Sequence, residues 1–446
     1  MSVTERVYSA LVRRSPETED QMPAESRRDL APNGLRLVLA NSLQSSGDQV
    51  VNASTVLPWL FAALGVPPAL TGVLVPIRES GSMLPQALLT PWVLRVRYRK
   101  WVFVTGALVQ AGAVAVMAAT ASFGEGLIAG LIIVAALAIF ALGRCLCSIS
   151  SKDVQGRTIP KGERGQLNGL ATTAAGLVAI TLGLAIRWFG GNDLEAEQLF
   201  WLLALGVVLW VMVAAVYAGI REPAGETPDE RSGAVEDPKP QVDNWFVDMI
   251  TLLRDDQPFR KFVTVRGLVL VSSLSPPFIV TLSVQSGASS LAGLGGFIIA
   301  SGLAALIGGR VFGRFADRSS KRLMSIGAGV ASTVIVVAVV VAQLPGFAAE
   351  TWLGNLVFVA AYFWLTLMHT GVRIGRKTYI VDMAQGDQRT VYVAVSNSAM
   401  GLILLVVGGV STLLALFHTI WALLFLALMG FIGAVAGARL PNVSRG

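Results

Sequence analysis

Long apolar stretches alternate with short polar segments along almost the whole chain. Each stretch has at least about the 20 residues that an α-helix needs to cross the hydrocarbon core of a bilayer. Six of them precede a polar segment at residues 221–260, and six follow it. The pattern predicts twelve membrane-spanning helices, at residues 35–63, 68–94, 101–120, 126–148, 166–189, 198–220, 262–284, 289–313, 322–343, 351–373, 392–416 and 418–439.

The composition supports a membrane protein and excludes several other classes. Hydrophobic residues make up 54% of the 446 residues and charged residues only 14%, whereas soluble domains carry roughly 25% charge. Disordered chains, disulfide-rich scaffolds and most cytosolic enzymes are excluded, but an enzyme embedded in a membrane is not. The chain has no P-loop, HExxH or GxSxG motif, and its two cysteines, Cys145 and Cys147, fit small packing residues. We therefore expect no metal, no cofactor and no enzymatic activity.

Lysine and arginine residues are confined to alternate polar segments. All 35 of them fall on one expected side of the membrane, except Arg78 inside the second stretch and Arg187 near the opposite face. Because cytoplasmic loops carry the excess of basic residues, both termini are expected in the cytoplasm. The net charge of +7 then reflects topology, and we expect no nucleic-acid partner. Residues 1–33 lack the apolar core of a cleavable signal peptide.

The two halves of the chain repeat the same order of stretches and basic loops. Residues 162–164 fall opposite residues 386–388, and residues 94–100 fall opposite residues 318–324. Two six-helix bundles with a site between them are therefore expected, as in transporters built from repeats. The expected division is a cytoplasmic N-terminal tail at 1–33, bundles at 34–220 and 261–440, a cytoplasmic linker at 221–260 and a C-terminal tail at 441–446.

The linker contains one amphipathic segment. Residues 244–254 place Trp245, Met249, Leu252 and Leu253 on one face of a helix. This pattern fits a helix that lies on the membrane surface. It fits equally a helix packed against the cytoplasmic ends of the spans, and the sequence leaves both open.

The loop after the eighth stretch carries a family motif. Residues 313–322, GRFADRSSKR, resemble the G-x-x-x-D-R-x-x-[KR]-[KR] loop signature of the major facilitator superfamily. Arg144 in the fourth stretch and residues 159–165, IPKGERG, are similar to further features of that family. With the six-plus-six layout, the resemblance covers about residues 34–440. It implies an all-α integral membrane transporter with twelve helices in two pseudo-symmetric six-helix bundles.

The resemblance also implies that these loops act as gates. In the family the loop is thought to latch the two bundles in one conformation, which a carboxylate near a helix end can do by pairing with arginine. The alternative is a tight turn whose basic residues only set the topology. Two features depart from the family: residues 94–100 lack the aspartate, and the fifth stretch lacks the proline of drug antiporters. The gating candidates are Gly313, Asp317, Arg318, Lys321, Arg322, Arg144, Arg164 and Arg373.

The first stretch carries a polar stripe through an otherwise apolar helix. Asn41, Gln44, Asp48 and Asn52 recur at helical spacing, and such a stripe must face protein or water rather than lipid. Asp48 lies roughly 20 Å along the helix from residue 35, well inside the bilayer. A carboxylate at that depth is a candidate proton carrier. The alternative is a neutral or paired Asp48 that satisfies neighbouring polar groups.

The second stretch adds a cation at similar depth. Arg78, Ser82 and Gln86 share one face, and Glu79 is offset by about 100°. Arg78 could bind a substrate carboxylate or phosphate. It could equally form an internal ion pair with Asp48 or Glu79, whereas an unpaired buried arginine is disfavoured.

The second half offers fewer polar candidates. Pro276 and Pro277 predict a kink in the seventh stretch. In the tenth stretch, His369 could titrate during transport or simply be hydrogen-bonded within the bundle. Trp364 could stack on a substrate or pack in the core.

These observations favour a secondary active transporter that moves a small organic solute by alternating access. Asp48 and Glu79 suggest proton coupling, and Arg78 suggests an organic anion. One alternative is a proton-driven exporter of amphiphilic compounds, and another is a non-transporting membrane assembly or sensor protein. The expected partners are a small-molecule substrate, protons and the lipid bilayer. A monomer in the cell membrane is expected, in the inner membrane if the source is a bacterium.

Overall fold

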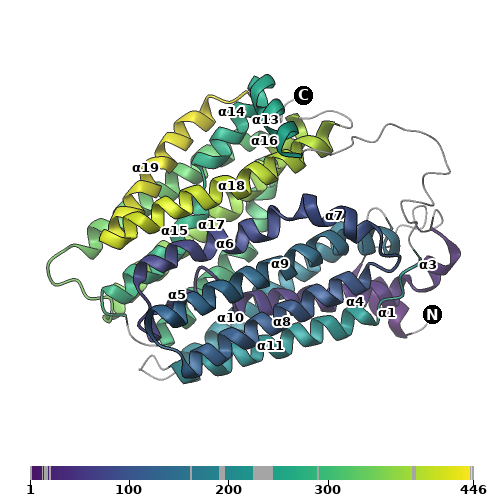
Figure 1. Ribbon diagram of the computed structural model, residues 1–446, viewed down its shortest axis with the longest axis horizontal. Coiled ribbons are helices and arrows are strands. Elements are labelled where there is room, and N and C mark those ends of the chain that lie inside the picture. The colour runs from purple at the N-terminus through teal and green to yellow at the C-terminus, as the bar shows by residue number, and fades with distance from the viewer. Residues whose placement is uncertain are drawn as a thin grey trace.

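The computed structural model describes residues 3–12, 14, 19, 22–160, 163–189, 196–224, 245–288, 291–383, 388–441 and 443, and every regular element in them is a helix. The helices are α1 (Val3–Leu11), α3 (Ala24–Arg28), α4 (Leu30–Val50), α5 (Val56–Ala63), the 3-10 helix η1 (Pro68–Leu70), α6 (Thr71–Met83), α7 (Gln86–Leu94), α8 (Lys100–Phe123), α9 (Gly126–Thr158), α10 (Arg164–Phe189), α11 (Ala196–Ala218), α13 (Trp245–Asp255), α14 (Gln257–Leu268), α15 (Val271–Gln285), α16 (Leu291–Ala342), α17 (Trp352–Met383), α18 (Gln388–Phe417) and α19 (Thr419–Ala438). Figure 1 shows α4–α11 on one side of the molecule and α13–α19 on the other.

The prediction of an all-helical membrane protein is confirmed. Eight helical segments within the described residues are long and apolar enough to cross a membrane: 100–123, 126–158, 198–218, 257–285, 318–342, 352–380, 395–417 and 419–438. Residues 173–188 and 293–308 form shorter apolar helices. The first two predicted spans are not among them, because each is broken into two pieces: α4 is 21 residues long but carries the polar stripe, and α5, α6 and α7 are short.

The break in the first span follows from local chemistry. Pro58 has no N–H and its ring clashes with the carbonyl four residues earlier, so the helix cannot run continuously through residue 54. Asn52 accepts a hydrogen bond from the Ser54 N–H at 2.8 Å, which stabilises the turn between α4 and α5. In the second span, Pro85 separates α6 from α7. At these breaks, backbone polar groups as well as side chains can face the interior of the bundle. A continuous helix would present only the side chains of one face there.

Two later spans also differ from the expected pattern. The predicted kink of the seventh span is present, but the helix breaks at residues 269–270, ahead of Pro276 and Pro277, which both lie inside α15. The eighth and ninth spans are joined by a short turn within α16, where Ser319 leaves helical geometry at φ −166° and ψ 94°.

The two halves pack closely where glycines replace side chains. A Cβ atom at Gly183 of α10 would lie 2.8 Å from the Gly295 carbonyl oxygen of α16. On the other flank, the Ser80 hydroxyl of α6 donates to the Gly401 carbonyl of α18 at 2.7 Å. These contacts join α4–α11 to α13–α19 on both sides of the central seam.

The internal repeat is visible at the level of single hydrogen bonds. Lys100 at the start of α8 donates from Nζ to the Ala218 and Ile220 carbonyls at the end of α11, at 3.2 and 2.8 Å. Lys321 in the second part of α16 donates from Nζ to the Leu440 carbonyl after α19, at 2.8 Å. In both halves a lysine therefore satisfies carbonyls at the end of the sixth span.

The linker helix α13 occupies the segment for which the sequence predicts an amphipathic helix. Leu252 and Leu253 are partly buried and pack against the hydrophobic core, whereas Ile250 is 48% exposed. The side chains of Trp245 and Met249 lie outside the described residues. At its C-terminal end, the helix packs against the bundle, which is the second of the two alternatives left open by the sequence.

Candidate functional site

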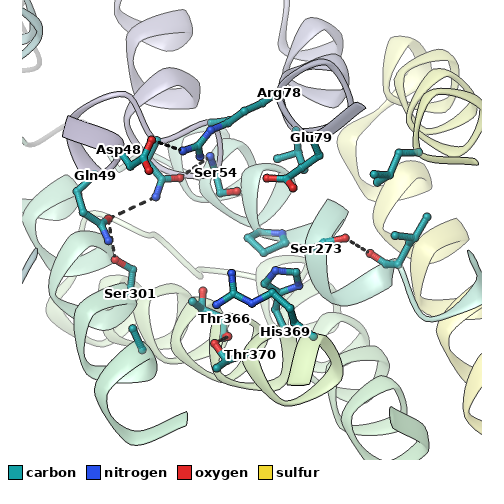
Figure 2. A pocket seen from close by; sticks show the side chains of 18 of the residues that line it. Asp48, Gln49, Ser54, Arg78, Glu79, Ser273, Ser301, Thr366, His369 and Thr370 are labelled. Atoms are coloured by element: carbon teal, nitrogen blue, oxygen red, sulfur yellow. Dashed lines mark hydrogen bonds and ion pairs between the residues drawn. The ribbon is translucent and has the colours of Figure 1, made fainter. Parts of the chain in front are cut away.

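A cavity of about 290 Å³ lies between the two halves of the molecule. The broken first and second spans form one wall, and α15, α16 and α17 form the facing wall (Figure 2). Its polar and charged lining residues are Asp48, Gln49, Asn52, Ser54, Arg78, Glu79, Arg144, Ser273, Ser301, Tyr362, Thr366, His369, Thr370, Arg373 and Arg376.

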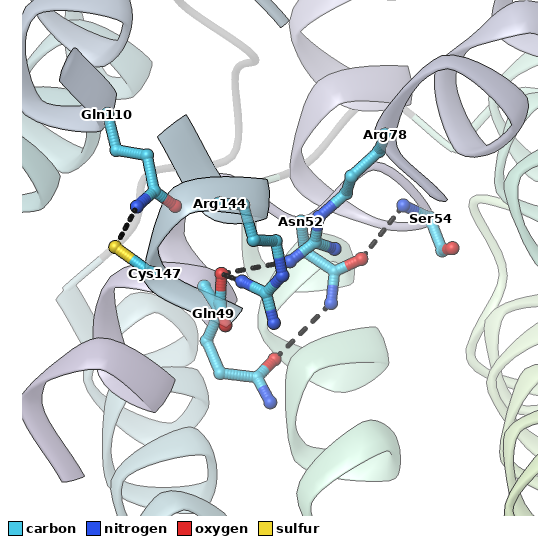
Figure 3. A network of polar contacts seen from close by, with 8 residues as sticks. Gln49, Asn52, Ser54, Arg78, Gln110, Arg144 and Cys147 are labelled. Atoms are coloured by element: carbon cyan, nitrogen blue, oxygen red, sulfur yellow. Dashed lines mark hydrogen bonds and ion pairs between the residues drawn. The ribbon is translucent and has the colours of Figure 1, made fainter. Parts of the chain in front are cut away.

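Asp48 is shared between two arginines. Arg78 of α6 donates to Asp48 Oδ1 at 3.0 Å, and Arg144 of α9 contacts the same oxygen (Figure 3). The three side chains are largely buried, with 18% of Asp48, 14% of Arg78 and 30% of Arg144 exposed. In this low-dielectric environment the pairing stabilises the ionised carboxylate. The internal ion pair that the sequence left as one alternative is therefore formed, with Arg144 as a second cation.

A chain of neutral polar groups crosses from this ion cluster to the other half. The Asn52 amide donates to Gln49 Oε1 at 3.4 Å, and the Ser301 hydroxyl of α16 reaches the same oxygen at 3.4 Å. Figure 3 shows the Gln49 side chain beside Asn52, and Figure 2 shows it beside Ser301. Gln49 thus joins α4 to the facing half through a side-chain contact that a movement of the halves would break.

The facing wall carries a cluster of basic residues on α17. His369, Arg373 and Arg376 lie on one helix face and line the cavity. Within the described residues, neither arginine forms an ion pair with an acid, and Arg376 Nε is buried without a hydrogen-bond partner. The Glu79 carboxylate lines the same cavity from α6; it forms no hydrogen bond or ion pair within that part of the chain, but it attracts Arg376 electrostatically. This wall of the cavity therefore presents unpaired cationic groups.

The charges of the cavity do not balance. Four arginines and two acids line it, which leaves a formal excess of two positive charges with His369 neutral: Arg78, Arg144, Arg373 and Arg376 against Asp48 and Glu79. Unpaired charges in a membrane interior are costly and mark ion or substrate sites. The arrangement is suited to an anion, which would supply the missing negative charge.

One end of the cavity is closed by aromatic rings from both halves. Trp59 of α5 lies 6.4 Å from Phe297 of α16, measured between ring centroids, and Phe297 lies 5.3 Å from Tyr362 of α17. Near this closure, Thr281 of α15 donates to Thr71 of α6 at 3.2 Å. The side chains of these two contacts between the halves, Trp59 with Phe297 and Thr71 with Thr281, are all buried. The structure is therefore closed at the end of the bundle that carries α5.

The structure gathers some of the predicted site residues and separates others. Asp48, Asn52, Arg78, Glu79 and His369 line the cavity. Asn41, Gln44, Ser82, Gln86 and Trp364 do not line it.

The outlying residues have other contacts. The Ser82 hydroxyl bonds to the Glu79 carbonyl at 2.8 Å, and the Gln86 amide bonds to the Ser82 carbonyl at 2.7 Å, so both satisfy their own helix. Trp364 is 46% exposed and lies beside Phe363, with 5.8 Å between ring centroids. Trp364 lies outside the lining of the central cavity and is not buried, so its position fits neither of the two roles that the sequence left open, substrate stacking and core packing.

The gating candidates fall into three groups. Arg144 is not in a loop but inside α9, where it pairs with Asp48, and Arg373 lines the cavity. Lys321 bonds to the end of α19, whereas Arg318 and Arg322 are exposed. Gly313 lies within α16, and the side chains of Asp317 and Arg164 lie outside the described residues, so the latch stays a prediction.

Sequence reasoning missed several contributors to the cavity, among them Gln49, Ser301 and Arg376. Gln49 and Ser301 are neutral residues without a motif, and only the tertiary contact between α4 and α16 reveals them. Arg376 could have been found, because it follows His369 and Arg373 at helical spacing.

A second ionic network lies outside the spans, beyond the end of α11. Glu222 is 7% exposed and accepts a hydrogen bond from the Lys100 N–H at 2.9 Å. Arg99 and Arg157 both pair with Asp153, at 2.5 and 2.8 Å. Burial raises the pKa of the Glu222 carboxyl above its usual range, against the opposing effect of the Lys100 N–H.

The comparisons with known proteins agree with this architecture. A sequence profile of the Major Facilitator Superfamily matches residues 37–372. A mutant of the nucleoside transporter NupG has a TM-score of 0.65 and 13% identity, over 91% of this chain and 99% of that one. A D-xylose-proton symporter has a TM-score of 0.67 and 14% identity, over 92% and 98%. A POT family transporter in complex with a thioalcohol-conjugated peptide has a TM-score of 0.67 and 11% identity, over 94% and 98%. A search of curated proteins finds no match. At these identities, the structural likeness shows the fold alone.

Proposed function

Because the chain belongs to the Major Facilitator Superfamily, and is therefore a multi-pass membrane transporter and not an enzyme, we propose that it carries a small organic anion coupled to protons. The observation that carries the proposal is the pair Arg373 and Arg376, which face the central cavity and form no ion pair among the described residues, with Glu79 as the one acid of the cavity that attracts Arg376 electrostatically. A bound carboxylate or phosphate would pair with them, and arginine binds such groups through two parallel hydrogen bonds.

The position of the anion differs from the one first suggested by the sequence. Arg78 already pairs with Asp48, so its charge is compensated within the protein. Arg373 and Arg376 are therefore the primary anchor, and His369 adds an imidazole on the same helix face. The cavity volume of about 290 Å³ is at the small end of the range for ligand sites, roughly 300–1,000 Å³, which suits a small solute.

Proton coupling is proposed through Asp48. An anion that reached Arg144 or Arg78 would compete with Asp48 for these cations and leave the carboxylate more readily protonated. Substrate and proton would then share one set of charges. One of the similar structures is described as a proton symporter, which is consistent with this kind of coupling in the fold.

Alternating access is proposed to move residues 34–220 against residues 261–440. The contacts at the closed end, Trp59 with Phe297 and Thr71 with Thr281, would have to separate when that end opens. The distribution of basic residues supports an orientation with the closed end outside and both termini in the cytoplasm. The location proposed is the cell membrane, or the inner membrane of a bacterium.

The other functions considered from the sequence have less support. Excess positive charge in the cavity disfavours amphiphilic cations as cargo, since they would be repelled. A non-transporting sensor has no need of unpaired arginines inside the membrane.

Thermal shift of the purified protein tests the proposal. A ligand that binds only the folded state raises the melting temperature. We expect organic mono- and dianions, and not organic cations, to stabilise the wild type, and Arg376→Gln to remove the effect. Arg254→Gln, an exposed residue of α13, serves as the matched control. Stabilisation by anions that survives in both Arg373→Gln and Arg376→Gln would rule out this site.

A further inference from the structure

A second hollow, of about 450 Å³, lies on the outer flank of the seam between the halves. It is found where α10 ends and where α16 and α17 begin, at the closed end of the bundle. Arg187 comes from one half, and Glu350, Trp352 and Asn355 come from the other. It shares no lining residue with the central cavity.

The hollow contains two opposite charges that do not satisfy each other. Both residues are exposed, and within the described residues neither the Arg187 guanidinium nor the Glu350 carboxylate forms a hydrogen bond or an ion pair. Gly296 leaves room between the polar groups, since a Cβ atom there would lie 3.8 Å from an Arg187 guanidinium nitrogen and 3.9 Å from Asn355 Oδ1. A guanidinium, an amide and a carboxylate thus line one hollow and remain available to a ligand.

The surroundings indicate the depth of the hollow in the membrane. Trp352 lines it and is 70% exposed, and Trp188, which follows Arg187 in the chain, is 83% exposed. Exposed tryptophans at the ends of spanning helices are typical of the headgroup level. Leu356, which is 47% exposed, and Val359 continue the lining along α17 toward the hydrocarbon side. The hollow therefore has a polar part at headgroup depth and an apolar part below it.

We infer that this hollow binds a zwitterionic phospholipid headgroup with a primary ammonium, of the ethanolamine type. The phosphate would pair with Arg187, and the ammonium would donate to Glu350 and to Asn355 Oδ1. A choline headgroup has no N–H to donate, and a glycerol headgroup has no cation for Glu350. The acyl chain would lie along Leu356 and Val359.

Occupancy of the hollow would bias the transport cycle. Its cationic group belongs to α10 and its acid to the segment before α17, so one headgroup would join the two halves. The helices are tightly packed here, with a Cβ at Gly295 falling 2.9 Å from the Arg187 backbone nitrogen. A ligand that binds this arrangement better than an opened one shifts the population toward closure at this end.

Binding to the purified protein in detergent tests the inference. Native mass spectrometry would count adducts with phosphatidylethanolamine, phosphatidylcholine and phosphatidylglycerol, and thermal shift would report stabilisation. We expect a preference for ethanolamine lipid. Arg187→Gln and Glu350→Gln should each weaken its binding about tenfold, as for loss of a charge-assisted hydrogen bond.

Controls separate this site from the others. Glu125→Gln removes an exposed acid at the same end but outside the hollow, and Arg376→Gln alters only the central cavity; both should bind the lipid as the wild type does. Unliganded melting temperatures show whether each variant is folded. Equal binding of the three lipids, or ethanolamine binding unchanged in Glu350→Gln, would overturn the inference. Equal stabilisation by soluble phosphoethanolamine would overturn the lipid assignment in favour of a free zwitterion.

Discussion

Arg78 donates a hydrogen bond of 3.0 Å to Asp48 Oδ1, and Arg144 contacts the same oxygen from a third helix. One carboxylate thus compensates two guanidinium groups in the interior of the bundle. Removing one partner of such a cluster differs from removing an isolated charge, because the remaining charges lose their compensation. Removing the acid Asp48 and removing an arginine without an ion pair should therefore have different effects on the stability of the folded protein.

Asp48→Asn should destabilise the folded protein and separate binding from coupling. It leaves Arg78 and Arg144 without a counter-ion, which costs a few kcal/mol in buried clusters. The two freed arginines should hold an anion at least as tightly as before, while transport driven by a pH gradient is lost. Counterflow and pH-driven uptake in proteoliposomes measure the two activities. Retention of pH-driven accumulation would remove Asp48 from the coupling step.

Arg376→Gln should weaken anion binding about tenfold or more without lowering the unliganded melting temperature. The substitution removes a buried charge that forms no ion pair in the described part of the chain. The empty protein is relieved of its desolvation cost and of repulsion from Arg373, which offsets the lost attraction of Glu79. Ligand titration by thermal shift, with Arg254→Gln as control, checks both effects. A melting temperature several degrees lower would instead indicate that Arg376 has a structural role.

Gly183→Val should disfavour the closed arrangement of α10 against α16. Its Cβ would lie 2.7 Å from an Ile299 side-chain carbon and 2.8 Å from the Gly295 carbonyl oxygen, and the backbone contact cannot move aside cheaply. Overpacking of this kind costs about 1–3 kcal/mol. Labelling of a cysteine introduced at Thr71 should become faster as this end opens. Gly112→Val, where nothing lies within 4 Å of the added Cβ, is the control.

Glu222→Gln should flatten the dependence of stability on pH. Burial raises the pKa of Glu222 in the folded state, so the folded protein binds this proton more tightly than the unfolded chain. The contribution of Glu222 to the unfolding free energy therefore falls as pH rises from the ordinary carboxyl range through the raised pKa. Melting temperatures between pH 4 and 7.5 should decline less steeply in the variant. If the melting temperature of Glu222→Gln changed with pH as steeply as that of the wild type, the raised pKa of Glu222 would be contradicted. Glu125→Gln is the control.

Much of the site was accessible from the sequence because membranes penalise polar residues. Asp48, Arg78, Glu79 and His369 stand out against apolar spans, and all four line the cavity. The penalty says only that a residue avoids lipid, not which neighbour it meets. From the sequence, Arg78 could therefore bind either a substrate or Asp48. The arrangement of the helices brings it to Asp48. Trp364 carried no such penalty, and its position on α17 turned it outward.

Helical periodicity, apolar length and the loop motif determined the all-helical class, the order of the spans and the family, since each depends on residues near one another in the chain. The tertiary structure alone decided which charges meet. The pairing of Asp48 with Arg144 joins residues far apart in sequence, and the contact of Gln49 with Ser301 joins the two halves. Such contacts depend on the rotation and depth of each helix against its neighbours, which packing sets and local sequence does not.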